Sequence, residues 1–170
     1  MFNELFRGST RHSNGYFYHE ALSLLKMKHL IPIIIGLLAL VGLADSVYLT
    51  LAHFQVIDPI TMESSGVCSL TVGSCLKVIL SPKATVAGIP HAVLGAAYFA
   101  VLLGAATIRM MIGRWFAPIE MFAFLLAGFA FSAYLTQELV LRMNAPCPFC
   151  LTAHAINAFV LALYAISVQP

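Results

Sequence analysis

Charged side chains are scarce in this 170-residue chain. They make up 9% of the residues, whereas hydrophobic side chains make up 61%, and the mean hydropathy is +0.92. A chain with so few charges cannot hide its apolar surface in a water-soluble core. The formal net charge of +2 is also too small, and too dispersed along the chain, to indicate nucleic-acid binding. The composition therefore predicts an integral membrane protein.

The sequence shows no sign of a second domain, and its apolar residues gather in four stretches. Each stretch is long enough for a helix that crosses ~30 Å of hydrocarbon, which takes about 20 residues. The stretches run approximately from His29 to Phe54, Gly88 to Met110, Phe116 to Arg142 and Cys147 to Val168. We expect an all-α membrane protein in which residues 29–170 form a four-transmembrane-helix bundle. The polar residues 1–28 are expected to form a soluble tail that is partly disordered.

The first stretch also has features of a secretory signal peptide, because small residues at Gly42-Leu43-Ala44 could form a cleavage site. Against this alternative, apolar residues resume after Asp45 and continue to Phe54, which favours one span with a polar stripe. Asp45 is then an acid inside the bilayer. Such acids are costly and usually face the bundle interior. Asp45 is predicted either to line a polar track for protons or to pack as a neutral acid.

The loop between the first two spans, Gln55–Ala87, is expected to carry a short helix on the membrane surface. Apolar residues recur at helical spacing between Val72 and Leu80, with polar residues between them. Pro82 ends this helix, since the residue before a proline is pushed out of helical geometry.

Small residues recur every four positions in the second span, at Ala96, Ala100 and Gly104. This pattern predicts a smooth face for close helix packing. His91, at the start of the same span, is interpreted as an interfacial side chain.

Cysteine is scarce too, with four residues, but all four fall into pairs. Cys147 and Cys150 form a Cys-x-x-Cys motif at the start of the last span. At the first turn of a helix, unpaired backbone N–H groups and the helix dipole favour a thiolate, and Pro148 suits that position because it needs no N–H partner. The motif is interpreted as a preorganised redox dithiol. Half of a zinc knuckle or two inert buried cysteines are the alternatives.

Basic residues near the span ends predict the orientation. Arg7, Arg11, Lys26, Lys28, Arg109 and Arg114 fall on one side, and Lys77, Lys83 and Arg142 on the other. The side with six basic residues is expected to face the cytoplasm, which places both termini there.

Cys68 and Cys75, in the long loop, then share the extracytoplasmic face with the Cys-x-x-Cys pair, in a compartment where disulfides persist. Two pairs at one face suit a relay of thiol–disulfide exchange. A Cys₄ zinc site remains an alternative, although six residues between Cys68 and Cys75 exceed the usual zinc-knuckle spacing.

Several motifs follow one another along the chain: Asp45-Ser46-x-Tyr48-Leu49-Thr50, Cys68 with Cys75, Ser81-Pro82, Gly88-Ile89-Pro90 with Gly95, and Cys147-Pro148-Phe149-Cys150 with Ala155-Ile156-Asn157. With these motifs the chain resembles the vitamin K epoxide reductase family of four-helix membrane oxidoreductases, as a stand-alone homologue of the bacterial type. The order of the motifs is specific, because the quinone-linked disulfide-formation proteins of the other bacterial type carry Cys-x-x-Cys in an earlier loop.

The resemblance implies a bundle around a quinone of the ubiquinone, menaquinone or vitamin K type. It implies that Cys150 lies nearest the quinone ring, that Cys147 exchanges with Cys75, and that Cys68 meets an external thiol partner. That partner is expected to be a separate thioredoxin-fold disulfide carrier, because the chain ends directly after its fourth span.

Further contacts to the quinone are expected from four residues, with no metal involved. They are His154, Ser81, Asn157 and Asp45. Several family members have a tyrosine at the position of His154 that can hydrogen-bond a quinone carbonyl. Histidine can donate the same bond and adds a titratable proton, although a packed histidine is the alternative. Ser81 is expected to approach the active cysteines as a polar helper.

These expectations describe a disulfide-generating enzyme of the bacterial inner (plasma) membrane, with its active site on the extracytoplasmic side. Electrons would pass from the carrier through Cys68/Cys75 to Cys147/Cys150 and then to the quinone. The alternatives are a vitamin K epoxide or quinone reductase of the endoplasmic reticulum, and a non-enzymatic membrane protein with structural disulfides or a Cys₄ zinc site.

Overall fold

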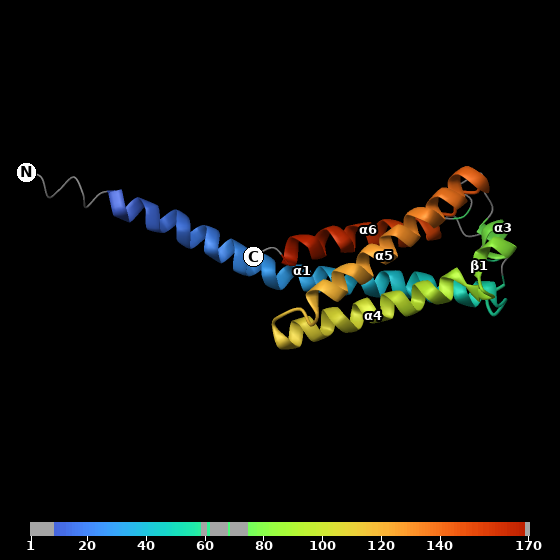
Figure 1. The fold of residues 1–170 in the computed structure, drawn as a ribbon, viewed down its shortest axis with the longest axis horizontal. Helices are drawn as coiled ribbons and strands as arrows, with labels where there is room; N and C mark the ends of the chain where they lie inside the picture. The colour runs from blue at the N-terminus through green and yellow to red at the C-terminus, as the bar shows by residue number, and fades with distance from the viewer. Residues whose placement is uncertain (1–8, 59–60, 62–67, 69–74, 169–170) are drawn as a thin grey trace, which may run out of the picture.

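Four long helices form the bundle in a computed structural model that describes residues 9–58, 61, 68 and 75–168 (Figure 1). The helices are α1 (Ser9–His53), α4 (His91–Ile112), α5 (Pro118–Gln137) and α6 (Pro148–Val168). Each contains a segment long and apolar enough to cross a membrane. These segments are His29–His53, His91–Ile112, Pro118–Arg142 and Pro148–Val168, of 25, 22, 25 and 21 residues. The predicted fold class is confirmed, with span ends within a few residues of those expected.

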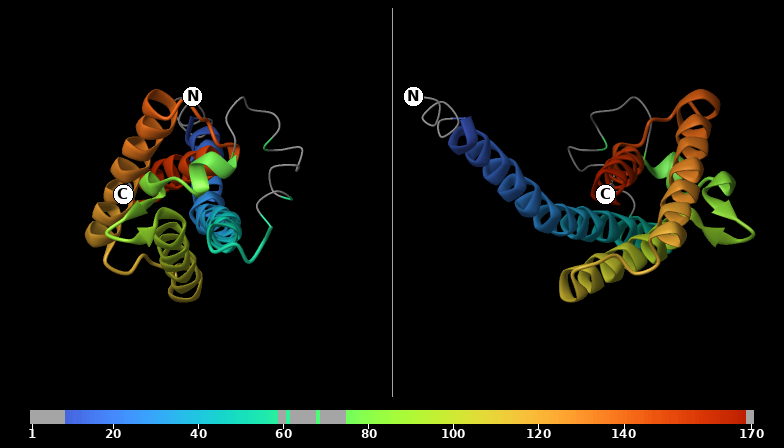
Figure 2. Two further views of the ribbon diagram at one scale, coloured as in Figure 1. Left: turned by 90° about the vertical axis from the view of Figure 1, so that its right-hand side faces the viewer. Right: turned by 60° about the vertical axis from the view of Figure 1, so that its left-hand side comes forward.

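Helix α1 is longer than the sequence suggests. The tail was expected to be partly disordered, but the helix begins at Ser9 and runs for 45 residues, and its N-terminal part projects beyond the bundle (Figures 1 and 2). The segment from Glu20 to Lys28 is rich in strong helix formers, and extending an existing helix needs no new nucleus. The boundary between tail and bundle at residue 28 stays a prediction.

The end of the bundle that holds the cysteines, here called the cysteine end, carries the shorter elements. These are α3 (Cys75–Ile79), the 3₁₀ turn η2 (Pro82–Ala84), and strands β1 (Thr85–Val86) and β2 (Ile89–Pro90). Helix α3 lies within the predicted surface segment and ends before Pro82, as expected. The strands form an antiparallel hairpin, which the sequence did not predict. Its turn, Ala87-Gly88, has positive φ at both residues, 51° and 81°, so the second span begins after Pro90 rather than at Gly88.

Helix α5 continues directly into one turn of π-helix, η3 (Glu138–Arg142). The backbone N–H of Met143 donates to the carbonyl of Glu138 over 2.9 Å, which completes this wider turn. Single π-helical turns are rare and are frequent at functional sites. This turn lies at the cysteine end.

The core lies where the four long helices converge. Its most buried members are Ile35, Ala39, Leu102, Ala106, Leu125, Val160 and Tyr164. Two glycines permit close contact. A Cβ at Gly42 would lie 2.6 Å from the ring of Phe99, and one at Gly128 would lie 2.5 Å from the ring of Tyr98. The expected small-residue face at Ala96, Ala100 and Gly104 makes no such contact within the described chain. Ala100 and Gly104 are exposed, and a Cβ at Gly104 would meet no atom within 4 Å.

Candidate redox site

The two cysteine pairs lie together at the cysteine end. Cys68 and Cys75 are joined by a disulfide, with an S–S distance of 2.09 Å, whereas Cys147 and Cys150 are free thiols. Cys68, Cys75 and Cys147 are buried in one apolar cluster with Leu49 of α1, and Cys150 packs against that cluster. The loop pair and the Cys-x-x-Cys pair are therefore neighbours in space, although more than 70 residues separate them in the sequence.

Cys147 caps the N-terminus of α6. Its carbonyl accepts the first helical hydrogen bond from the N–H of Leu151 over 3.0 Å, and Pro148 is the first residue of the helix. A hydrogen bond from the Cys150 thiol lowers the pKa of Cys147 below its ordinary value, and the N–H groups of Cys150 and Phe149 act in the same direction. Burial opposes this shift without reversing it. Cys147 is therefore the thiol of the pair that ionises first, as its place at a helix start predicts.

Two contacts fix the surrounding elements. The rings of Tyr48 and Phe149 pack with centroids 5.6 Å apart, which joins α1 to the Cys-x-x-Cys motif. His53 Nδ1 lies 2.8 Å from the carbonyl oxygen of Ile79, and because a carbonyl can only accept, Nδ1 carries the proton. This bond holds α3, and Cys75 at its start, against the end of α1.

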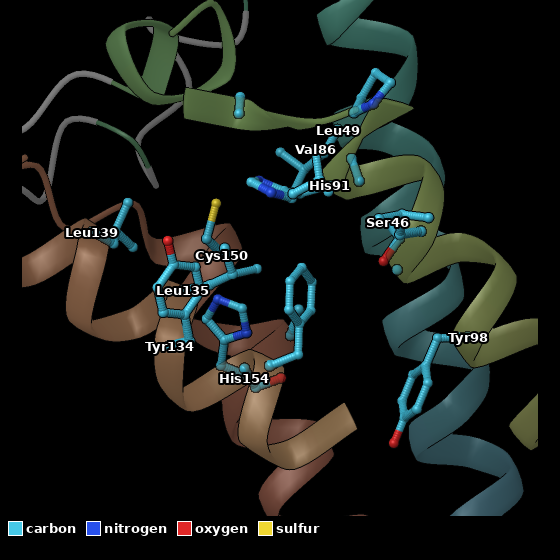
Figure 3. A pocket seen from close by; sticks show the side chains of 18 of the residues that line it. Ser46, Leu49, Val86, His91, Tyr98, Tyr134, Leu135, Leu139, Cys150 and His154 are labelled. Carbon is cyan, nitrogen blue, oxygen red and sulfur yellow. The ribbon is translucent and has the colours of Figure 1, made fainter. Parts of the chain in front are cut away.

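A cavity of about 830 Å³ lies beside the dithiol, inside the bundle. Figure 3 shows Cys150 and His154 of α6 projecting into it, with His91 of α4 across from them. Its walls come from all four long helices and include Leu49, Tyr98, Phe131, Leu135 and Leu139. Cys147 is fully buried behind Cys150 and is not among the described residues that line the cavity. Of the two active thiols, Cys150 is thus the one in contact with the cavity.

His91 is the wall residue that the sequence reasoning missed. It was interpreted as an interfacial side chain, but it lies on the cavity wall with its ring edge-on to Phe131, at a centroid distance of 5.7 Å. Its Nε2 atom is buried and has no hydrogen-bond partner in the described chain. The available signal was its place directly after Gly88-Ile89-Pro90, because Pro90 precedes α4 and directs His91 into the first helical turn at the cysteine end.

The other predicted contacts differ in position. Asn157 lies on the cavity wall, but its amide is engaged: Oδ1 accepts from the Tyr98 hydroxyl over 2.6 Å, and Nδ2 donates to Ser132 Oγ over 2.9 Å. Ser81 caps η2, where its hydroxyl oxygen accepts from the N–H of Lys83 over 3.2 Å. Neither Ser81 nor Asp45 is among the described residues that line the cavity. Their roles stay predictions.

Charged side chains gather where η2 meets η3. Glu138 Oε1 lies 2.6 Å from the guanidinium of Arg142, and its Oε2 lies 3.7 Å from Lys83 Nζ. All three residues line the cavity. In the described residues, no three His, Cys, Asp or Glu side chains are arranged to hold a metal ion. The charges therefore pair with one another at this edge.

Comparison with known proteins gives one result. The model of the vitamin K epoxide reductase family matches residues 33–165. The chain belongs to this family. No curated protein and no solved structure matches it. Members of the vitamin K epoxide reductase family are membrane oxidoreductases that couple thiol–disulfide chemistry to quinones and generally use thioredoxin-like partners. The chain is accordingly an integral membrane protein with the redox chemistry of this family.

The cavity fits the head group of the quinone that the vitamin K epoxide reductase family uses. A quinone ring is flat and apolar, with one carbonyl oxygen at each end. The walls offer apolar surfaces at Leu49, Phe131 and Leu135, and hydrogen-bond donors at His91 and His154. The unpartnered Nε2 of His91 is a buried polar atom that such an oxygen would satisfy.

Proposed function

We propose that this protein is a thiol–quinone oxidoreductase that generates disulfides for a separate thioredoxin-fold carrier. The observation that supports it best is the Cys150 thiol on the wall of an apolar cavity, directly in front of a buried cluster that contains Cys68, Cys75 and Cys147. A buried cluster of two pairs suits internal exchange, and an apolar cavity suits a lipid-soluble electron acceptor.

The relay begins at the loop pair. A carrier thiolate attacks Cys68 and, after exchange, leaves Cys68 and Cys75 reduced. The Cys75 thiolate then attacks Cys147 in the Cys147–Cys150 disulfide, so that a Cys75–Cys147 bond forms and Cys150 leaves as a thiolate. Cys68 attacks Cys75, which restores the loop disulfide and releases Cys147. The structure has a Cys68–Cys75 disulfide and free thiols at Cys147 and Cys150, which corresponds to the stage after Cys147 has been released.

The position of Cys147 favours both steps in which it takes part. A thiol with a lowered pKa is the better leaving group of a pair and has the larger thiolate fraction. The hydrogen bond from Cys150 and the N–H groups of the first turn lower the pKa of Cys147. Cys147 is therefore readily released by Cys68 and is ready to close the disulfide with Cys150.

In this proposal the cavity would hold the electron acceptor. When bound, a quinone supplies the acceptor for the two electrons and two protons that the dithiol gives up. His154, one helical turn after Cys150, and His91 on the opposite wall would hydrogen-bond the two carbonyl oxygens. The basic residues predict that this end faces the extracytoplasmic side of a bacterial inner membrane.

Purified protein tests the proposal directly. Given a reduced thioredoxin-fold protein, it should bleach the absorbance of added ubiquinone or menaquinone, with one disulfide formed for each quinone consumed. Cys147→Ser and Cys150→Ser are the matched inactive controls. A wild-type protein that oxidises no thiol protein with either quinone would overturn the proposal, and reduction of vitamin K epoxide at a higher rate would favour the epoxide-reductase alternative.

A further inference from the structure

Asp45 is a partly buried acid whose role is not explained by the cavity. Its Oδ2 atom is buried and accepts no hydrogen bond within the part of the chain that the structure describes. A carboxylate in an apolar setting is expensive unless it is paired, and an orphaned buried oxygen needs an explanation. Because Asp45 does not line the cavity in the described chain, contact with a quinone does not supply that explanation.

The face of α1 that carries Asp45 packs against the dithiol. Asp45, Tyr48, Leu49 and Ala52 stand three or four residues apart and so share one helix face. Leu49 and Ala52 belong to the buried cysteine cluster, and the ring of Tyr48 packs on that of Phe149. Asp45 is the member of this face nearest the middle of the span. Its charge interacts with both thiols of the Cys-x-x-Cys pair.

We propose that the Asp45 carboxylate accepts the proton that the Cys147–Cys150 dithiol loses as it forms its reactive thiolate. The S–H bond of one thiol breaks and an O–H bond forms on Asp45, directly or through one water molecule, and no electrons are exchanged. When the dithiol is oxidised by the quinone of the proposed reaction, two protons leave: one from the remaining thiol and one from Asp45, which returns to the carboxylate. The inference rests on the proposed function and assigns a residue to its proton step.

A negative charge on Asp45 disfavours a second negative charge on the dithiol. The Asp45 carboxylate raises the pKa of the Cys147 thiol, because two like charges in an apolar site oppose each other. A thiolate therefore forms most easily when Asp45 takes up the proton. The titratable and charged side chains of the described chain that line the cavity beside the dithiol are Cys150 and His154 of α6, His91 and Tyr98 of α4, Tyr134 of α5, Glu138 and Arg142 of η3, Lys83 of η2 and His53 of α1. Asp45 and Tyr48 are not on this wall but on the face of α1 that packs against the Cys-x-x-Cys motif. Of these two, Asp45 is the one with a carboxylate that can take up a proton.

Infrared difference spectroscopy of the full chain tests the step without a quinone. The protein is reduced with dithiothreitol and reoxidised with diamide while the C=O band of protonated carboxyl groups and the S–H band of thiols are recorded at several pH values. The reduced form should gain a carboxyl C=O band, and isotopic labelling of aspartate should shift that band. Its absence from the wild-type spectrum would overturn the proposal, even if no Asp45 variant folds.

Three variants complete the test. Asp45→Asn should lose the band, show S–H loss at a pH lower by about one unit or more, and reduce quinone at least about 10²-fold more slowly. Asp45→Glu should recover the band and most of the rate, whereas Asp58→Asn, which removes an exposed carboxylate in the loop, should behave as wild type. The shift in S–H loss follows from removal of the charge alone, so the carboxyl C=O band, which a merely structural Asp45 would not produce on reduction, is the deciding readout. An Asn variant that keeps the band or the wild-type rate would overturn the proposal. The infrared experiment contains no quinone. A missing carboxyl band would therefore contradict the role of Asp45, whereas a wild-type protein that cannot reduce quinone would contradict the proposed function.

Discussion

The two ends of the bundle differ in how far their buried polar atoms are hydrogen-bonded. At the end away from the cysteines, here called the closed end, Trp115 Nε1 donates to Ser167 Oγ over 3.0 Å and the Tyr164 hydroxyl donates to the carbonyl of Pro118 over 2.9 Å. Arg109 Nε is a buried atom without a partner there, but its guanidinium lies over the Trp115 ring, 5.9 Å from the centroid. At the cysteine end, Asp45 Oδ2 and His91 Nε2 are both buried and unpartnered in the described chain.

This difference separates stability from chemistry. Unpaired buried polar atoms, a π-helical turn and a large cavity all cost folding free energy. The π-helical turn, the cavity and two of the three unpaired buried atoms of the described chain lie on the side of the dithiol. The closed end instead packs fully buried side chains such as Tyr164 and Ala106, and its hydrogen bonds join α6 to the start of α5 and to the connection between α4 and α5. Real proteins violate the rules of packing and pairing at functional sites and compensate elsewhere. The comparison predicts that changes at one end alter turnover, whereas changes at the other alter unfolding.

The largest expected effect is on turnover, at Cys150. Cys150→Ser should reduce quinone at least about 10³-fold more slowly, because the thiol that contacts the cavity is gone. The variant should also trap a Cys75–Cys147 disulfide, which forms when the Cys147 thiolate attacks Cys75 in the loop disulfide and releases Cys68, because Cys150 is no longer present to attack Cys147 and resolve the bond. Mass spectrometry after cycling with carrier and oxidant identifies the bond. Detection of Cys68–Cys75 together with a free Cys147, and no mixed disulfide, would mean that the order of exchange is wrong.

Tyr164 tests the closed end in the complementary way. It is 1% exposed, so Tyr164→Ala should lower the unfolding free energy by about 3 kcal/mol through the cavity it leaves. Tyr164→Phe removes only the bond to Pro118 and should cost about 1 kcal/mol. Denaturant titration of the purified protein measures both, and turnover per folded molecule should stay near wild type. A variant that is stable but slow would contradict the division between the two ends.

Gly128 lies where the two ends meet. A Cβ there would lie 2.5 Å from the Tyr98 ring, so Gly128→Ala should displace Tyr98 and break its bond to Asn157, at a cost of about 1 to 3 kcal/mol. Because Tyr98 lines the cavity, the KM for quinone should rise by an order of about tenfold. Gly104→Ala is the matched control, since a Cβ there meets nothing within 4 Å in the described chain. If Gly128→Ala and Gly104→Ala changed the KM for quinone equally, Tyr98 would have no specific role in quinone binding.

The features that the sequence predicts well are those that local composition controls. Apolar runs of about 20 residues predict spans because no other structure satisfies the backbone inside a bilayer. The place of Cys147 at a helix start follows from Pro148, which suits a first turn and has no N–H to lose. The family follows from the order of several motifs and is confirmed by the match over residues 33–165.

The features that escape prediction depend on contacts between distant segments. The direction of His91 into the cavity is fixed by the hairpin before α4 and by Phe131 of α5, neither of which is visible in the residues around it. The glycines that permit close packing, Gly42 and Gly128, are opposite aromatic rings of α4 rather than in a regular small-residue repeat. Asp45 was predicted as a quinone contact from its motif, yet the next residue, Ser46, is the one on the cavity wall.

The smallest expected effect concerns the ion pairs at the cysteine end, whose strength depends on salt concentration. Glu138 of η3 pairs with Lys83 of η2 and with Arg142. Both partners are largely exposed, with 58% of the Lys83 side chain and 67% of the Arg142 side chain accessible. Such pairs contribute at most about 1 kcal/mol and weaken as salt rises. Glu138→Gln should therefore speed hydrogen exchange of the amides in η2 and β1 by at most about fivefold, which is the same free-energy scale.

High salt should reproduce this effect in the wild-type protein and add little in the variant. Amides around Tyr164 should exchange at the same rate in both proteins and at all salt concentrations, because hydrogen bonds and packing, rather than ion pairs, hold that end. Lys83→Gln is the matched variant: if the Lys83–Glu138 pair carries the effect, the double variant should be no faster than either single one. Faster exchange at both ends would show instead that the ion pairs support the whole bundle, and the two ends would no longer be separate in stability.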